Sequence, residues 1–164
     1  MRRLWLKECA IAGFMLFSFA MVKGAFSQGM KSDHWSTAEL LERAKHLKEQ
    51  AAEKGSASET LEKYPHHYTM LAFRNRSGGG EVHQNYADVF YILDGHATLV
   101  TGGALVEPKP TGPGETLGTS VQGGSRQELK AGDVVHIPAS MPHQMALGEG
   151  DTITYFVIKV EETH

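Results

Sequence analysis

Short runs of β-branched and aromatic residues, separated by glycine-containing turns, dominate the sequence from residue 66 onwards. The clearest of these runs are 68–75, 87–94, 96–101, 133–138 and 152–160. Glycine accounts for 18 of the 164 residues and does not follow the period of collagen. Short strands at this spacing, with frequent tight turns, predict an all-β sandwich or barrel and not a helix bundle.

A single amphipathic helix is predicted at 36–54, before the first of the strand-like runs. Ser36 followed by Glu39 forms a possible capping box, in which each side chain satisfies a free backbone N–H of the other residue. Apolar residues recur at helical spacing, and Gly55 is a suitable end. We expect this helix to pack on the barrel or on a partner subunit.

The first 27 residues have the order of a secretory signal: a basic start, an apolar run at 9–22 and small residues at Ala25 and Ser27. The apolar run is short for a membrane span, although an uncleaved anchor is the alternative. We therefore expect three parts: a cleaved signal peptide (1–27), an N-terminal helical extension (28–65) and a β-barrel domain (66–164). The mature chain would be exported, periplasmic or secreted, with no stable membrane span.

Charge and cysteine content exclude several classes of function. The formal net charge of −3 excludes a strongly basic nucleic-acid binder, so we expect no nucleic-acid partner. Cys9 is the only cysteine and lies in the predicted leader. The mature chain would therefore have no disulfide, no cysteine nucleophile and no zinc site built from thiolates.

The ionisable residues that could carry chemistry fall in two segments bounded by glycines, 80–95 and 132–143. In an extended strand Glu81 and His83 project to the same face, because the side-chain period is two. Asp88 opens the next apolar run, and His143 precedes a new strand. Imidazoles and carboxylates that converge from separate strands are the ligands a divalent metal ion requires.

The second segment resembles a signature of the cupin superfamily, whose members are small jelly-roll β-barrels. That signature reads Gly, five residues, Pro, one residue, Gly, two residues, His, three residues, Asn. Gly132, Pro138 and His143 occupy its positions in this sequence. Ser140 replaces the inner Gly and Leu147 replaces the terminal Asn. The resemblance covers roughly residues 66 to 160 and implies a jelly-roll barrel preceded by the helix.

The other cupin signature reads His, one residue, His, three or four residues, Glu, six residues, Gly, and it is degenerate here. Asp88 and Gly95 fit its last part, with Asp in place of Glu. A four-residue spacer puts His83 at the second His position and Glu81 at the first. The degeneracy therefore falls on the positions that hold the metal in this superfamily.

Carried over residue by residue, the resemblance implies that Glu81, His83, Asp88 and His143 bind a divalent metal ion. Iron, manganese, nickel and zinc all remain open. A three-residue spacer would instead put Val82 at a ligand position, which implies a metal-free or altered site.

The resemblance implies a protein that binds a metal ion in the barrel and acts on a small molecule, and the predicted leader adds export. Dioxygenase, isomerase and decarboxylase chemistry all occur on this fold, and the fold alone does not choose among them. The alternative is a non-catalytic barrel that binds a small molecule or a metal through a degenerate site. A third reading is an oligomeric barrel with a structural role only. The sequence assigns no catalytic residue, so the question of enzyme activity stays open.

Two further features concern the surface of the barrel. The stretch 107–125, rich in glycine and proline, is too long for a passive hairpin. It forms a short extra hairpin, a lid, an oligomer contact or a tolerated surface insertion. The closing run 152–160 is too apolar to stay exposed, so we expect a homodimer that pairs through sheet edges.

Overall fold

The structure is a computed structural model and describes residues 32–162; the predicted leader, 1–27, lies outside the described residues. The helix and the strands belong to one compact unit that begins at His34. Within residues 32–162 no helix combines the length and the apolar character that crossing a membrane requires.

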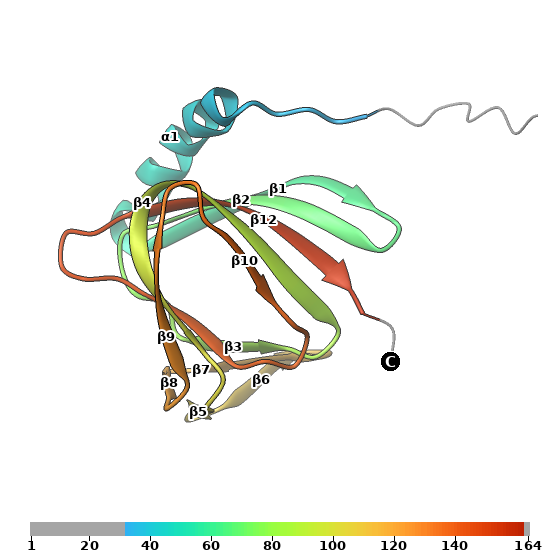
Figure 1. The fold of residues 1–164 in the computed structure, drawn as a ribbon, viewed down its shortest axis with the longest axis vertical. Coiled ribbons are helices and arrows are strands. Elements are labelled where there is room, and N and C mark those ends of the chain that lie inside the picture. Colours follow the sequence, from blue (N-terminus) through green and yellow to red (C-terminus); the bar gives the residue numbers. More distant parts are fainter. Residues whose placement is uncertain (1–31, 163–164) are drawn as a thin grey trace, which may run out of the picture. The chain divides into compact units, whose positions relative to one another are not determined.

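The elements follow one another with short connections along the described part of the chain (Figure 1). They are α1 (Thr37–Lys54), β1 (Ser56–Tyr64), β2 (His67–Arg74), β3 (Gly80–His83), β4 (Tyr86–Thr101), β5 (Ala104–Val106), β6 (Lys109–Gly112), β7 (Glu115–Gly118), β8 (Ser120–Gln122), β9 (Ser125–Lys130), β10 (Val134–Ile137), β11 (His143–Ala146) and β12 (Ile153–Glu161).

The predicted helix and its capping box are confirmed. The backbone N–H of Glu39 donates to Ser36 Oγ at 3.2 Å, and the Ser36 N–H donates to the Glu39 carboxylate at 2.7 Å. Gly55 ends the helix with φ of 86°, a left-handed conformation that a glycine adopts without strain. Both ends of α1 are therefore fixed by residues next to them in sequence.

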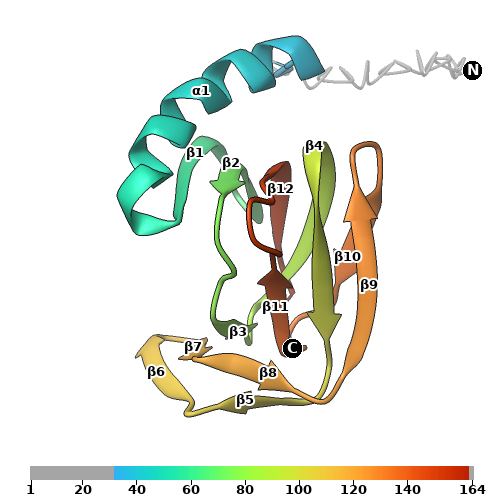
Figure 2. The same cartoon turned by 90° about the vertical axis from the view of Figure 1, so that its left-hand side faces the viewer.

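The strands form a curled antiparallel sheet with β4 at its centre, in the order β1-β2-β12-β4-β11-β3-β7-β6 (Figures 1 and 2). The first part of β4 pairs with β12 and β10, and its last part pairs with β11 and β9. The all-β jelly-roll prediction is therefore confirmed, with the helix at its N-terminal side.

Gly95 lies inside β4 and does not end it. The sequence predicts two strands here, 87–94 and 96–101, whereas the structure has one continuous strand. Gly95 has φ of 80°, and a Cβ at this position would lie 2.0 Å from the carbonyl oxygen of Thr152. The glycine thus lets the strand bend and pass close to the backbone that leads into β12.

The first strand begins at Ser56, ten residues before the strand region that the sequence predicts. This strand, β1, pairs with β2 along its whole length at one edge of the sheet. Its residues are mostly polar and carry no run of apolar side chains, because an edge strand with one face toward solvent does not need them. Part of the expected helical extension, 28–65, is therefore β-structure.

The sheet buries apolar side chains on both faces. On the outer face α1 lies against the sheet, in a cluster of Leu40, Ala44, Leu47, Ala51, Leu71, Phe73 and Leu93. The concave inner face holds a second cluster of buried residues from six strands, among them the fully buried Ile92, Leu99, Ile137 and Ile153. The cavity described below opens from this inner face.

The structure bears on two predictions about the surface, the exposure of the closing strand and the form of the stretch 107–125. The closing strand, β12, lies between β2 and β4 inside the sheet, so the argument that it needs a partner subunit to cover it is wrong. The homodimer itself stays a prediction. The stretch 107–125 contains a short extra hairpin, β6 and β7, which extends the sheet beyond β3.

Candidate metal centre

Glu81, His83 and His143 meet on the inner face because of how β3 and β11 pair. His143 is the register partner of Glu81 across these two strands. His83 follows Glu81 by two residues, so its side chain points to the same face of β3. Two neighbouring strands thus supply three side chains to one point, as the spacing in the sequence predicts.

The three side chains form a compact cluster with little access to solvent. His83 and His143 are 8% and 2% exposed. The Glu81 carboxylate lies 3.5 Å from His143 Nε2 and 3.8 Å from His83 Nε2. One ligand atom from each residue lies within 4.8 Å of the other two, so the three could hold a metal ion together.

Both imidazole rings are oriented by a contact at their other nitrogen. His83 Nδ1 lies 2.5 Å from the Glu115 carboxylate, and His143 Nδ1 lies 3.0 Å from the carbonyl oxygen of Met141. With a proton on each Nδ1, the Nε2 atoms point into the cluster. Both Nε2 atoms are buried and lack a hydrogen-bond partner among the described residues. This arrangement is typical of histidines that ligate a metal ion.

The charges in the cluster favour an ionised carboxylate. Burial alone would raise the pKa of Glu81, but His143, His83 and Lys159 outweigh burial and lower the pKa to about 2. Burial alone would lower the pKa of His143, but contacts with Asp88 and Glu81 raise it to about 9. A metal ion would therefore have to displace a proton from His143 Nε2 near neutral pH.

Asp88, the fourth expected ligand, lies beside the cluster with its carboxylate paired to a lysine. It is 1% exposed, and its Oδ2 lies 3.6 Å from His83 Nε2 and 3.5 Å from His143 Nε2. The ammonium of Lys159, its cross-strand partner on β12, lies 2.7 and 2.8 Å from the two oxygens. Asp88 therefore lies as close to the two Nε2 atoms as Glu81 does, with its carboxylate also paired to Lys159, and its role as a ligand stays a prediction.

The donor set fits a divalent transition metal. Two imidazole nitrogens and one carboxylate oxygen suit non-haem iron, and the same set also occurs in catalytic zinc sites. Three protein ligands would leave coordination positions open for a small molecule. The residues present thus fit the metal that the fold implies, with Glu81, His83 and His143 as its holders.

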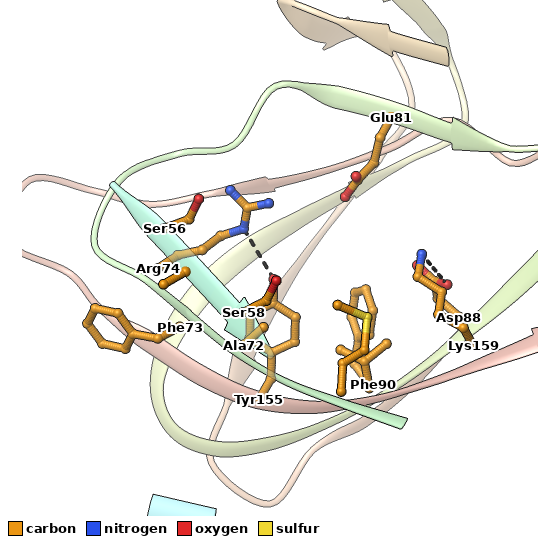
Figure 3. A pocket seen from close by; sticks show the side chains of 13 residues that line it. Ser56, Ser58, Ala72, Phe73, Arg74, Glu81, Asp88, Phe90, Tyr155 and Lys159 are labelled. Atoms are coloured by element: carbon orange, nitrogen blue, oxygen red, sulfur yellow. Dashed lines mark hydrogen bonds and ion pairs between the residues drawn. The ribbon is translucent and has the colours of Figure 1, made fainter. Parts of the chain in front are cut away.

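A cavity of about 270 Å³ lies next to the cluster, between β1, β2, β4 and β12 (Figure 3). Glu81, Asp88 and Lys159 belong to its wall, together with Arg74 and Tyr155. Met70, Ala72, Phe90 and Val157 supply its apolar surface. The volume is slightly below the range usual for drug-sized ligands, which limits an occupant to a small molecule.

Besides Ser56 and Ser58, the sequence prediction lacks four residues of the site: Arg74, Glu115, Lys159 and Tyr155. A period-two signal was available for three of them. Met70, Ala72 and Arg74 share one face of β2, and Tyr155, Val157 and Lys159 share one face of β12. Arg74 and Lys159 each stand at the end of one of these series, and a charged residue in an otherwise apolar, inward-facing series indicates a cavity wall. Glu115 had no such signal, because it lies in the glycine-rich insertion.

Comparison with known proteins supports the fold. No family model matches the chain, and no curated protein matches its sequence. The cupin domain of Cnp3 from Schizosaccharomyces pombe superposes with a TM-score of 0.50 at 9% identity, covering 65% of this chain and 65% of that domain. The polyketide cyclase RemF from Streptomyces resistomycificus gives 0.48 at 18% identity, covering 66% and 67% of the two chains. KdgF from Halomonas sp. gives 0.48 at 14% identity, covering 68% and 84%. The chain has the cupin fold.

Proposed function

We propose that this cupin-fold chain binds one divalent transition-metal ion through Glu81, His83 and His143 and acts on a small molecule in the adjacent cavity. One observation carries the proposal: two buried imidazoles have their Nδ1 atoms held by acceptors, while their Nε2 atoms lie beside the Glu81 carboxylate and have no hydrogen-bond partner within 32–162. Leaving these nitrogens unpaired in the protein interior costs roughly 1–3 kcal/mol each. A bound ion would remove that cost.

The chain's own residues would divide the work in the site. Glu115 and the Met141 carbonyl would keep the two rings turned toward the ion. The Asp88–Lys159 pair would line the wall without adding net charge. A bound divalent ion would supply an electrophile that polarises a substrate oxygen from an open coordination position.

The second candidate function is a non-catalytic barrel that captures a small molecule or a metal ion. Its support is the state of Asp88, whose carboxylate is occupied by Lys159. Once Glu81 binds the metal, no free carboxylate at the metal remains to accept a proton. Turnover would distinguish the two candidates, since a binding barrel consumes neither oxygen nor substrate.

Metal analysis of the full chain, purified anaerobically without an affinity tag or chelator, tests the proposal. We expect close to one equivalent of iron, manganese, nickel or zinc per chain, and its identity would select the chemistry to screen. A protein that stays metal-free after incubation with each of these ions would contradict the proposal. The search would then turn to ligands of a metal-free barrel.

We also propose that the chain is exported and cleaved after Ser27. The basic start and the short apolar run in residues 1–27 support this proposal. Mass spectrometry of the protein recovered outside the cytoplasm should find an N-terminus at Gln28. Recovery of the intact chain in the cytoplasm would contradict export.

A further inference from the structure

Arg74 presents a positive charge to the cavity and forms no ion pair with a carboxylate of the described residues, although Glu81 lies close enough to act on it electrostatically. Its side chain reaches from the end of β2 into the cavity, on the same side as the Glu81 carboxylate (Figure 3). Nε donates to the Tyr155 hydroxyl at 3.2 Å. No ion pair joins the guanidinium to an acidic residue within 32–162. The remaining guanidinium N–H groups are therefore available to a ligand.

The other charges of the cavity are already paired. Lys159 is neutralised by Asp88, with both carboxylate oxygens within 2.8 Å of its ammonium. The Glu81 carboxylate faces His143 and His83. Arg74 is thus the charged residue of this wall without a direct ion pair among the described residues, and an ion at the metal centre would draw on the Glu81 carboxylate and add to the positive field. A ligand with a negative charge fits this wall best.

Tyr155 shapes the same end of the cavity. Burial raises the pKa of its hydroxyl, which therefore stays protonated near neutral pH. The oxygen accepts from Arg74, and within the described residues its own proton has no acceptor and can be donated. A guanidinium and one hydroxyl provide donors for the two oxygens of a carboxylate.

We propose that Arg74 and Tyr155 bind the carboxylate of a small organic acid whose apolar part lies against Phe90, Met70 and Val157. The inference rests on the proposed function, because it names the class of molecule that occupies the cavity beside the metal centre. A carboxylate fits better than a phosphate, since one positive charge without an ion pair among the described residues and a cavity of about 270 Å³ suit a small monoanion.

The lack of a side chain at Gly78 leaves the space that the Arg74 guanidinium occupies. A Cβ at this position would lie 2.7 Å from Arg74 Nη1. Gly78→Ala should therefore displace the guanidinium while keeping its charge. This variant separates the position of Arg74 from its charge.

The test is ligand binding to the chelator-treated full chain, followed by NMR or calorimetry. The probes are monocarboxylates from acetate to octanoate, branched and 2-oxo acids of similar size, the corresponding amides, and inorganic phosphate. We expect at least one carboxylate to bind and its amide not to bind. Arg74→Gln should weaken that binding by about tenfold to 100-fold, as expected for a lost charged hydrogen bond. Gly78→Ala and Tyr155→Phe should weaken it less.

Arg126, exposed on β9, provides the matched control for loss of one positive charge. Arg126→Gln should leave carboxylate binding unchanged. The inference would be overturned if no carboxylate binds, if the amides bind equally well, or if phosphate binds more tightly than every carboxylate. Equal weakening by Arg126→Gln would overturn it as well.

Metal content of the same proteins keeps this inference distinct from the proposed function. Arg74→Gln should bind metal like the wild type, because Arg74 is not a proposed ligand. Metal binding without Arg74-dependent carboxylate binding would overturn the inference alone. Arg74-dependent carboxylate binding by a chain that never takes up metal would overturn the metal centre and support the inference.

Discussion

The two faces of β2 carry different kinds of side chain, although the residues of the two faces alternate along one strand. Leu71 and Phe73 point outward into the apolar cluster under α1. Met70, Ala72 and Arg74 point inward and line the cavity. The outer face thus buries mainly apolar side chains, with the Thr69 hydroxyl and the Lys48 ammonium over the Phe73 ring as its polar groups, whereas the inner face carries a charge toward the site.

The same contrast holds for the sheet as a whole. Buried aliphatic residues between α1 and the sheet stabilise the fold through the area they remove from water. On the inner face, His83, His143 and Asp88 are buried polar groups, and two of their nitrogens lack a partner among the described residues. Buried polar groups without a hydrogen bond lower stability, and at the two histidines a bound metal ion would offset that loss. The outer face therefore serves stability and the inner face serves binding, and mutations should separate the two.

The largest expected effect is loss of metal from the inner face. His83→Ala and His143→Ala each remove one of three ligands, so metal content should fall from near one equivalent to below detection. Elemental analysis of the purified proteins measures this. His136, exposed on β10, is the matched control, and His136→Ala should keep its metal. Full metal content in either site variant would contradict the assignment.

The next effect is loss of stability from the outer face. Leu47 is 1% exposed and packs between α1 and the sheet. Leu47→Ala should lower the free energy of unfolding by about 2–5 kcal/mol, the usual cost of a truncated core leucine. Urea titration measures this, and the exposed Glu49→Ala should change stability by less than about 0.5 kcal/mol. Reduced metal content in folded Leu47→Ala would show that the two faces are not independent.

A smaller effect is expected at Glu115, which touches the site only through His83. Glu115→Ala frees His83 Nδ1 and should weaken metal affinity by about tenfold to 100-fold while leaving the stoichiometry at one. Competition with a chelator of known affinity measures this. Glu149→Ala, in an exposed turn, is the control. Unchanged affinity in Glu115→Ala would mean that His83 does not need this carboxylate to orient its ring.

Local signals made the outer face predictable from sequence. The capping box joins residues three apart, and the apolar period of α1 can be read within one segment. The predicted strands 68–75, 133–138 and 152–160 lie within one residue of β2, β10 and β12. By contrast β1 was missed, because a polar edge strand has no apolar alternation to indicate it.

The inner face depends on residues far apart in sequence. Glu81 and His83 could be placed on one face of a strand by their spacing alone, and His143 by its resemblance to a cupin signature. The contacts of Glu115 with His83 and of Lys159 with Asp88 span 32 and 71 residues. Such pairs follow from sheet register, which no local pattern fixes. The role of Asp88 therefore could not be judged before its partner was known.

The smallest effect tests whether the start of α1 matters to the inner face. Ser36→Ala removes the side-chain acceptor for the Glu39 N–H and should cost about 1 kcal/mol of stability. Ser36→Asp keeps an acceptor at the same place and should retain most of that stability, which urea titration of both variants measures. Since the cap lies on α1, outside the cavity wall, metal content and carboxylate binding should stay at wild-type levels in both proteins. If Ser36→Ala weakened either metal binding or carboxylate binding, α1 would support the site as well as the fold. The two faces of the sheet would then not act independently.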